Sequence, residues 1–228
     1  MHDYMHDYVL TRSNRKTTAI YVRNGIVEVR APMRMRKGVI DVIVALKKDW
    51  IAGKLAESQE QMARRSNFSL TYGDLVTYRG KQYPIAEIYD GSHGFDGKCF
   101  VMPPDLTPEQ VKSYCVRVFR MLAERDLTAR TLDYAAVMGV KPSSIRINNA
   151  KARWGSCSRD GRINYAWRLI MADDEVIDYI LIHELAHMIE LNHSTRFWAL
   201  VEDNIPDYKV RQKRLDELQR RLGGENWD

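Results

Sequence analysis

The chain has 228 residues, few cysteines and no long apolar run, and these absences narrow its class. Its three cysteines, Cys99, Cys115 and Cys157, show no Cys-x-x-Cys spacing. An odd and sparse set of this kind is typical of reduced intracellular thiols. The longest strongly apolar stretches, of about seven residues, are far shorter than the ~20 that a membrane span requires. The sequence therefore predicts no association with a membrane.

A secretory signal and a strong charge excess are also lacking. The N-terminus repeats Met1-His2-Asp3-Tyr4 as residues 5–8, without a basic region followed by an apolar core. We expect a frayed terminus there, and a soluble cytoplasmic protein. The net charge of +5 comes from 35 Lys and Arg residues against 30 Asp and Glu residues. Such a balance indicates a mixed, solvated surface, so nucleic acid is not a favoured partner.

The first half of the chain alternates strand-like and helix-like patterns. Residues 8–31 are rich in β-branched and aromatic residues, and Asn24-Gly25 predicts a tight hairpin turn. Residues 38–64 show helical spacing, and residues 70–90 return to short strands with a second hairpin at Arg79-Gly80. The helical stripe comprises Val39, Val42, Ile43, Leu46, Trp50, Ile51 and Leu55. A linker-like Met102-Pro103-Pro104-Asp105 then predicts a β-rich hairpin and helix region over 1–104 and a metal-binding catalytic domain over 105–228.

The second half of the chain predicts helices around a short sheet. Thr107-Pro108 has the form of a helix start, and a separate helix is expected over 132–140. Ile145–Ile147 and Ile163–Trp167 alternate as strands do. Asp173 is a plausible cap for a largely apolar, central helix, and residues 207–222 predict an amphipathic terminal helix. The fold class expected is α+β.

The most informative segment is His183-Glu184-Leu185-Ala186-His187. Two histidines four apart on a helix share one face, one turn apart, which suits two ligand positions of a tetrahedral zinc site. Without a metal, two imidazoles and a carboxyl buried on such an apolar helix would carry a penalty of several kcal/mol. Glu184 lies beside the open coordination position, where it can take a proton from water as a general base.

The third ligand is less directly defined, because Glu190, His193 and Glu202 all compete for it. An unbroken helix would rotate His193 about 120° away from His187. His193 is therefore a ligand only if the helix ends first, and Asn192 can supply that break because it tolerates the left-handed conformation. We favour His193, since three protein ligands leave a fourth position for water.

Three further residues are candidates for the neighbourhood of the metal. Arg153 can hold a carboxylate, a phosphate or a developing oxyanion, although a surface position beside Trp154 is an equal interpretation. Arg168 would share the neutralisation of phosphate charge if the substrate were a nucleotide. Cys157 is either a fourth ligand that closes the site or, as we favour, a small buried hydrophobe.

These motifs together resemble the YgjP-like metallopeptidase-domain family. The resemblance covers nearly the whole chain and rests on Arg153–Cys157, Trp167–Ile170, Val176–Tyr179, His183–His187, Asn192–Ser194 and Phe197-Trp198. It implies a zincin-like α+β domain in which His183, His187 and His193 hold Zn²⁺ and Glu184 is the catalytic acid and base. It also implies two substrate classes, because the family is labelled metallopeptidase by motif and is linked to metal-dependent pyrophosphatase activity on nucleoside triphosphates such as UTP.

Three hypotheses for function follow. The first is a zinc-dependent hydrolase of the metallopeptidase type that cleaves peptides with Glu184 as general base. The alternative is a pyrophosphatase of UTP-type nucleoside triphosphates, for which Mg²⁺ is a possible further cofactor. Arg153 and Arg168 would then be candidates to bind the phosphates, since no Walker-type glycine-rich loop is present. The third is a non-enzymatic, zinc-stabilised binding module, against which an intact Glu184 argues.

Overall fold

The computed structural model describes residues 7–89, 91 and 93–228, so most of the N-terminal repeat lies outside the described residues. The chain divides into two compact units, residues 1–68 with 223–226, and residues 69–222 with 227–228. The functional division expected between residues 104 and 105 stays a prediction, and the boundary between the compact units lies at residue 68. Helices and small sheets occur in both units, so the α+β class is confirmed.

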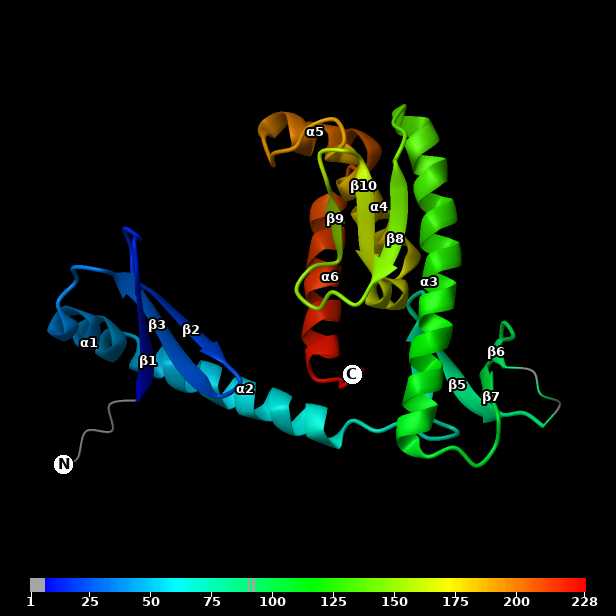
Figure 1. Cartoon of the computed structure of the whole chain (residues 1–228), viewed down its shortest axis with the longest axis horizontal. Coiled ribbons are helices and arrows are strands. Elements are labelled where there is room, and N and C mark those ends of the chain that lie inside the picture. Colours follow the sequence, from blue (N-terminus) through cyan, green and yellow to red (C-terminus); the bar gives the residue numbers. More distant parts are fainter. Residues whose placement is uncertain (1–6, 90, 92) are drawn as a thin grey trace. The chain divides into compact units, whose positions relative to one another are not determined.

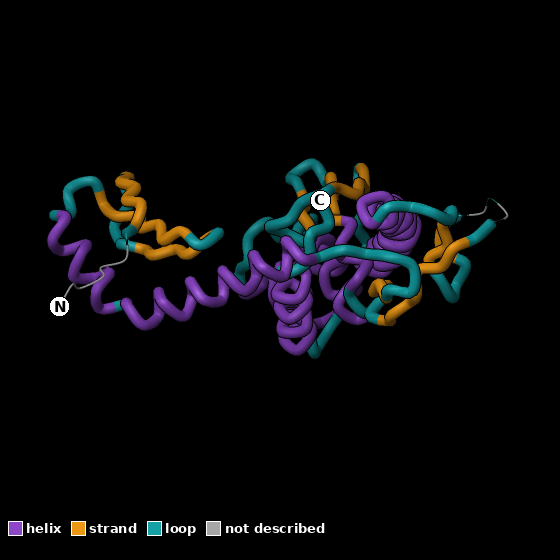
Figure 2. The backbone as a smooth tube through the Cα atoms, turned by 90° about the horizontal axis from the view of Figure 1, so that it is seen from below, coloured by secondary structure: helices purple, strands orange, loops and turns teal. Residues whose placement is uncertain are grey.

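The first unit packs a three-stranded sheet against two helices, which can be followed in Figures 1 and 2. The strands β1, β2 and β3 lie in the order β1-β3-β2, with β1 parallel and β2 antiparallel to β3. The predicted turn is present, because Asn24 and Gly25 both have positive φ values, of 51° and 74°. The elements are β1 (Tyr8–Ser13), β2 (Ala19–Arg23), β3 (Ile26–Pro32), α1 (Lys37–Leu46) and α2 (Lys48–Asn67).

The helical pattern predicted over 38–64 was wrong in two respects. It forms two helices separated at Lys47, and the residues that α1 buries are Ile40 and Val44. Val42 and Leu46 of the expected stripe are 59% and 79% exposed. Since α1 is apolar on nearly all sides, periodicity alone could not identify the face that packs on the sheet.

The second unit contains two small sheets and the long helix α3. One sheet has the order β4-β5-β7-β6, and the other places β10 between β8 and β9. Figure 1 shows α3 beside β8 and α4, and these elements are in contact. The elements are β4 (Leu75–Tyr78), β5 (Lys81–Glu87), β6 (Gly94–Phe95), β7 (Phe100–Met102), α3 (Pro108–Met138), β8 (Ser144–Asn148), β9 (Gly155–Cys157), β10 (Arg162–Ala166), the 3₁₀ turn η1 (Trp167–Met171), α4 (Asp174–Ala186), α5 (Thr195–Asn204) and α6 (Tyr208–Gly223).

Helix α3 begins and ends where local chemistry requires. Thr107 and Gln110 form a reciprocal capping box, Pro108 occupies the first turn, and Gly139 ends the helix in the left-handed conformation. The separate helix expected over 132–140 was wrong, because residues 123–131 contain neither glycine nor proline and the helix continues through them.

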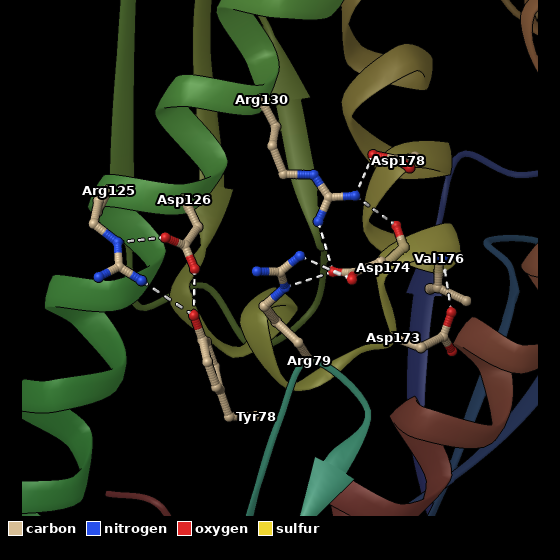
Figure 3. A network of polar contacts seen from close by, with 9 residues as sticks. All are labelled: Tyr78, Arg79, Arg125, Asp126, Arg130, Asp173, Asp174, Val176 and Asp178. Carbon is tan, nitrogen blue, oxygen red and sulfur yellow. Dashed lines mark hydrogen bonds and ion pairs between the residues drawn. The ribbon is translucent and has the colours of Figure 1, made fainter. Parts of the chain in front are cut away.

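A polar network fixes the N-terminal end of α4 (Figure 3). Arg79, at the tip of the β4–β5 turn, donates to both carboxylate oxygens of Asp174 at 2.6 and 2.8 Å. Arg130 of α3 donates to Asp174 at 2.8 Å and to Asp178 at 2.5 Å. A Cβ on Gly80 would lie 2.7 Å from the Cβ of Asp173, so the turn meets the helix start closely. The position of α4 is therefore set from two neighbouring elements.

Among the helices that the structure describes, none combines the length and the apolar character needed to cross a bilayer.

We predict that Asp174→Asn lowers the free energy of unfolding at neutral pH by about 1 kcal/mol, because the variant loses a charged acceptor that two arginines share. The loss is small because the Asp174 side chain is 49% exposed, and solvent screens its ion pairs. The hydrogen bond from Arg79 holds the pKa of Asp174 below its usual value, against the effect of burial. This contribution is complete above the unfolded pKa of about 3.9 and disappears as the pH falls through the lowered folded value.

Chemical denaturation at pH 7 and at steps below pH 4 measures this difference. The control is Glu60→Gln, which removes the exposed ion pair between Glu60 and Arg64. This variant should have the same free energy of unfolding as the parent, because exposed ion pairs contribute little to stability. An Asp174→Asn variant as stable as the parent at pH 7 would show that the network does not hold α4.

Candidate metal centre

The three histidines lie where α4 ends and α5 begins. His183 is in the last turn of α4, His187 is its C-cap residue, and His193 directly precedes Ser194, the N-cap of α5. The helix ends at Ala186 in a tight turn, with N–H groups of Met188 and Ile189 donating three residues back at 3.0 Å.

The expected helix break at Asn192 was wrong in its details. The non-glycine residues with positive φ in the described chain are Asn24, Arg79 and Asp105, so Asn192 is not left-handed. The break precedes it, at the end of α4, and the turn over 187–189 redirects the chain. The requirement that the helix end before His193 is nevertheless met.

The histidines converge closely enough to share one cation. One ligand nitrogen from each of His183, His187 and His193 lies within 4.8 Å of the others. The two Nε2 atoms of His183 and His193 are 3.2 Å apart. Tetrahedral ligands ~2.0–2.1 Å from zinc are about 3.3–3.4 Å from each other, so this separation fits a shared ion.

The tautomer of His187 is set by the backbone. Its Nδ1 lies 3.2 Å from the carbonyl oxygen of Glu190. A carbonyl oxygen can only accept, so Nδ1 carries the proton and Nε2 keeps its lone pair. Glu190 thus contributes its backbone carbonyl to the centre, as a typical partner of a metal-binding histidine does.

Burial favours the neutral form of His183 and His187, which is the form that binds a metal. Burial, together with the neighbouring His187 and His193, lowers the pKa of His183 to about 3. Burial also lowers the pKa of His187. The Nδ1 atom of His183 is buried without a hydrogen-bond partner in the described chain. The Nε2 atom of His183, which faces Nε2 of His193, is the nitrogen placed to bind a shared cation.

Phe197 of α5 packs against all three rings. Its ring centroid lies 4.9, 4.4 and 4.7 Å from those of His183, His187 and His193, and it is fully buried. Trp198 stacks on His193 at 5.6 Å. These aromatic contacts restrict ring rotation. Sequence reasoning missed this role of Phe197, for which the only signal was an aromatic pair four residues after His193.

Glu184 lies on α4 beside His183 and is only 5% exposed. Burial raises the pKa of its carboxyl to about 8, and the positive charge of Arg153 opposes this rise. Its Oε2 atom is buried and has no hydrogen-bond partner in the described chain. A buried, unpaired carboxyl is costly, and such groups cluster at functional sites.

The other candidate ligands are not part of this cluster. The metal-competent group found among the described residues consists of the three histidines and includes neither the Glu190 side chain, nor Glu202, nor Cys157. Cys157 lies on β9, where burial and then the charge of Glu184 raise the pKa of its thiol to about 11. It therefore remains a protonated thiol at neutral pH.

The two candidate substrate arginines have different surroundings. Arg153 has an exposed side chain whose charge acts on Glu184. Arg168 is 9% exposed, donates to Asn149 Oδ1 at 2.8 Å, and lies 3.6 Å from a carboxylate oxygen of Asp228. Its guanidinium also lies over the ring of Trp167. Arg168 is thus engaged within the fold, and contact of either arginine with substrate stays a prediction.

Comparison with known proteins gives one family and two solved structures. The model of the family described as YgjP-like, metallopeptidase domain matches residues 16–218. The metallopeptidase zymogen of Pyrococcus abyssi abylysin is 26% identical, with a TM-score of 0.38, over 44% of this chain and 97% of that one. The metallopeptidase zymogen of Methanocaldococcus jannaschii jannalysin is 21% identical, with a TM-score of 0.36, over 41% of this chain and 98% of that one. No curated protein matches this chain.

We predict that His193→Ala weakens zinc binding by more than ~100-fold, because loss of an outer hydrogen-bond partner alone typically costs ~10–100-fold. Glu202→Ala serves as the matched control and should keep full metal content, since Glu202 is exposed and outside the cluster. Metal analysis after dialysis, followed by zinc titration against a competing chelator, measures both. If Glu202→Ala lost more zinc than His193→Ala, the third ligand would be Glu202 and not His193.

Proposed function

Because the chain belongs to the YgjP-like metallopeptidase-domain family, we propose that it is a zinc-dependent hydrolase that cleaves peptide bonds. One observation carries the proposal. Three histidine nitrogens lie within 4.8 Å of one another, and Glu184, which directly follows the first of these histidines, is buried and has an unpartnered carboxyl oxygen. This combination supplies a cation site and a proton acceptor, the two groups that a hydrolase of this type needs.

His183, His187 and His193 would hold the ion. Three imidazoles favour zinc over magnesium or calcium, which prefer oxygen ligands. Three protein ligands also leave one coordination position for water or substrate, as in catalytic rather than structural zinc sites. Zinc bound there would supply Lewis-acid chemistry, acidifying water and polarising a carbonyl group.

Glu184 would move the proton. Its carboxylate accepts a proton from the attacking water at the unpartnered Oε2 and later gives it to the amine that leaves. Water adds to the carbonyl carbon, the C–N bond breaks, and the products are a carboxylic acid and an amine. Burial raises the pKa of Glu184 and so favours the protonated form that gives a proton to the amine. The positive charge of Arg153, and that of a cation held by the histidines, would favour the carboxylate that accepts one.

The substrate test compares peptides with nucleoside triphosphates, and Zn²⁺ with Mg²⁺, on purified protein. Casein-like peptides are followed by amine release, and the nucleotides by release of phosphate or pyrophosphate. We expect peptide cleavage that depends on zinc and is lost with a chelator. Release of pyrophosphate without peptide cleavage would contradict the proposal and select the nucleotide pyrophosphatase. Turnover of neither substrate class, with zinc bound, would favour a binding module.

We predict that Glu184→Gln retains zinc and loses hydrolysis by ~10²–10⁴-fold, because glutamine fills the same space without accepting a proton. Metal content and kcat are measured on the same preparation. The control is Glu124→Gln, an exposed carboxylate on α3, which should keep the parent rate. Parent-level turnover by Glu184→Gln would remove the general base from the mechanism.

A further inference from the structure

Strand β9 passes unusually close to Glu184. A Cβ atom built on Gly155 would lie 2.5 Å from Glu184 Oε1, 2.6 Å from its Cγ and 2.7 Å from its Cδ. All three distances are well inside van der Waals contact. The carboxyl group therefore occupies the space that a side chain at position 155 would fill.

Backbone conformation does not explain a glycine at this position. Gly155 is not among the residues with positive φ, and it pairs with Tyr165 in the regular antiparallel ladder of β9 and β10. Any residue could adopt its conformation, and most would strengthen the strand. Glycine is needed at position 155 because a side chain there would collide with Glu184.

Residues around Gly155 also interact with Glu184. Helix α4 is in contact with β9. Cys157 lies two residues after Gly155 on β9, and residues two apart on a strand share a face. Arg153 precedes the strand and has an exposed side chain. Cys157 and Arg153 both interact electrostatically with Glu184.

One oxygen of the Glu184 carboxyl has no hydrogen bond that would fix the side chain. Among the described residues, its Oε2 is buried without a partner. A side chain without hydrogen bonds takes its position from packing. The surface of β9 at Gly155 leaves no room for a side chain between itself and the carboxyl end, so it limits where the carboxyl can lie.

We propose that Gly155 is a positioning residue for Glu184, and that its missing side chain lets the carboxyl lie beside the metal centre. The inference rests on the proposed function, because it assigns Gly155 a part in presenting the general base. The carboxyl, rather than either backbone, would move if a side chain were added. Strand β9 is held by its ladder with β10, and α4 is held at its start by Arg79 and Arg130, whereas the Glu184 side chain can rotate.

The test is Gly155→Ala, with Gly53→Ala as the matched control. A Cβ at Gly53, within helix α2, meets no atom within 4 Å, so the control makes the same chemical change without a collision. We expect Gly155→Ala to lower kcat by ~10–100-fold with KM nearly unchanged, since a displacement of about 1 Å can cost ~100-fold. Zinc content and Tm should stay close to those of the parent. Gly53→Ala should match the parent in kcat, KM and zinc content, and its Tm should not fall, because alanine favours the helix over glycine.

Two further measurements separate positioning from damage to the fold. A crystal structure of Gly155→Ala should show the Glu184 carboxyl displaced and the three histidines in place. The double variant Gly155→Ala/Glu184→Asp should lose less activity than the product of the two single losses, because a shorter side chain relieves the collision.

Several results would overturn the inference. A parent-level kcat in Gly155→Ala, an unmoved carboxyl, or multiplicative losses in the double variant would each do so. If Gly155→Ala did not fold, Gly155→Ala/Glu184→Ala should fold, and its failure would place the collision elsewhere. A Glu184→Gln variant that keeps the parent activity would contradict the proposed function. The effect of position 155 on the Glu184 carboxyl could still be tested then, because the crystal structure of Gly155→Ala shows whether the carboxyl moves.

Discussion

Three polar side chains at the end of one largely buried helix, His183, Glu184 and His187, impose the main constraint on this structure. Helix α4 is buried on most sides, and it ends with two imidazoles and a carboxyl that water cannot fully solvate. Burial of such groups is favourable only if a partner compensates for lost hydration. A cation shared by His183, His187 and His193 would compensate the imidazoles, and Phe197 packs against all three rings.

The two ends of α4 have different tasks. Its start is held by arginines from the β4–β5 turn and from α3, which converge on Asp174 (Figure 3). Its end carries the metal-competent cluster and Glu184. Because a helix is stiff along its axis, fixing its first turn also limits movement of residues nine or ten positions later. Ion pairs that contribute modestly to stability can therefore matter for the precision of the centre.

Local signals predicted the parts of this protein that depend on local chemistry. Asn24-Gly25 and Thr107-Pro108 were interpreted correctly, because turn and cap geometry follow from neighbouring residues. The face of α1 and the continuity of α3 were not, since both are decided by what packs against them. At the metal centre, spacing on one helix brought His183, Glu184 and His187 into the prediction. Gly155 could not be recognised in the same way, because its relation to Glu184 arises only when β9 and α4 meet.

The hydrogen bond from His187 to the backbone carbonyl of Glu190 limits how substitutions can change the electron-donating strength of the His187 ring. Where a carboxylate side chain orients an imidazole, a single substitution can replace or remove it and alter how strongly the ring donates electrons. Here the acceptor belongs to the main chain, and every amino acid at position 190 would present the same oxygen. A substitution at position 190 therefore leaves this hydrogen bond in place. A change in the length or path of the turn after α4 would be needed to remove it.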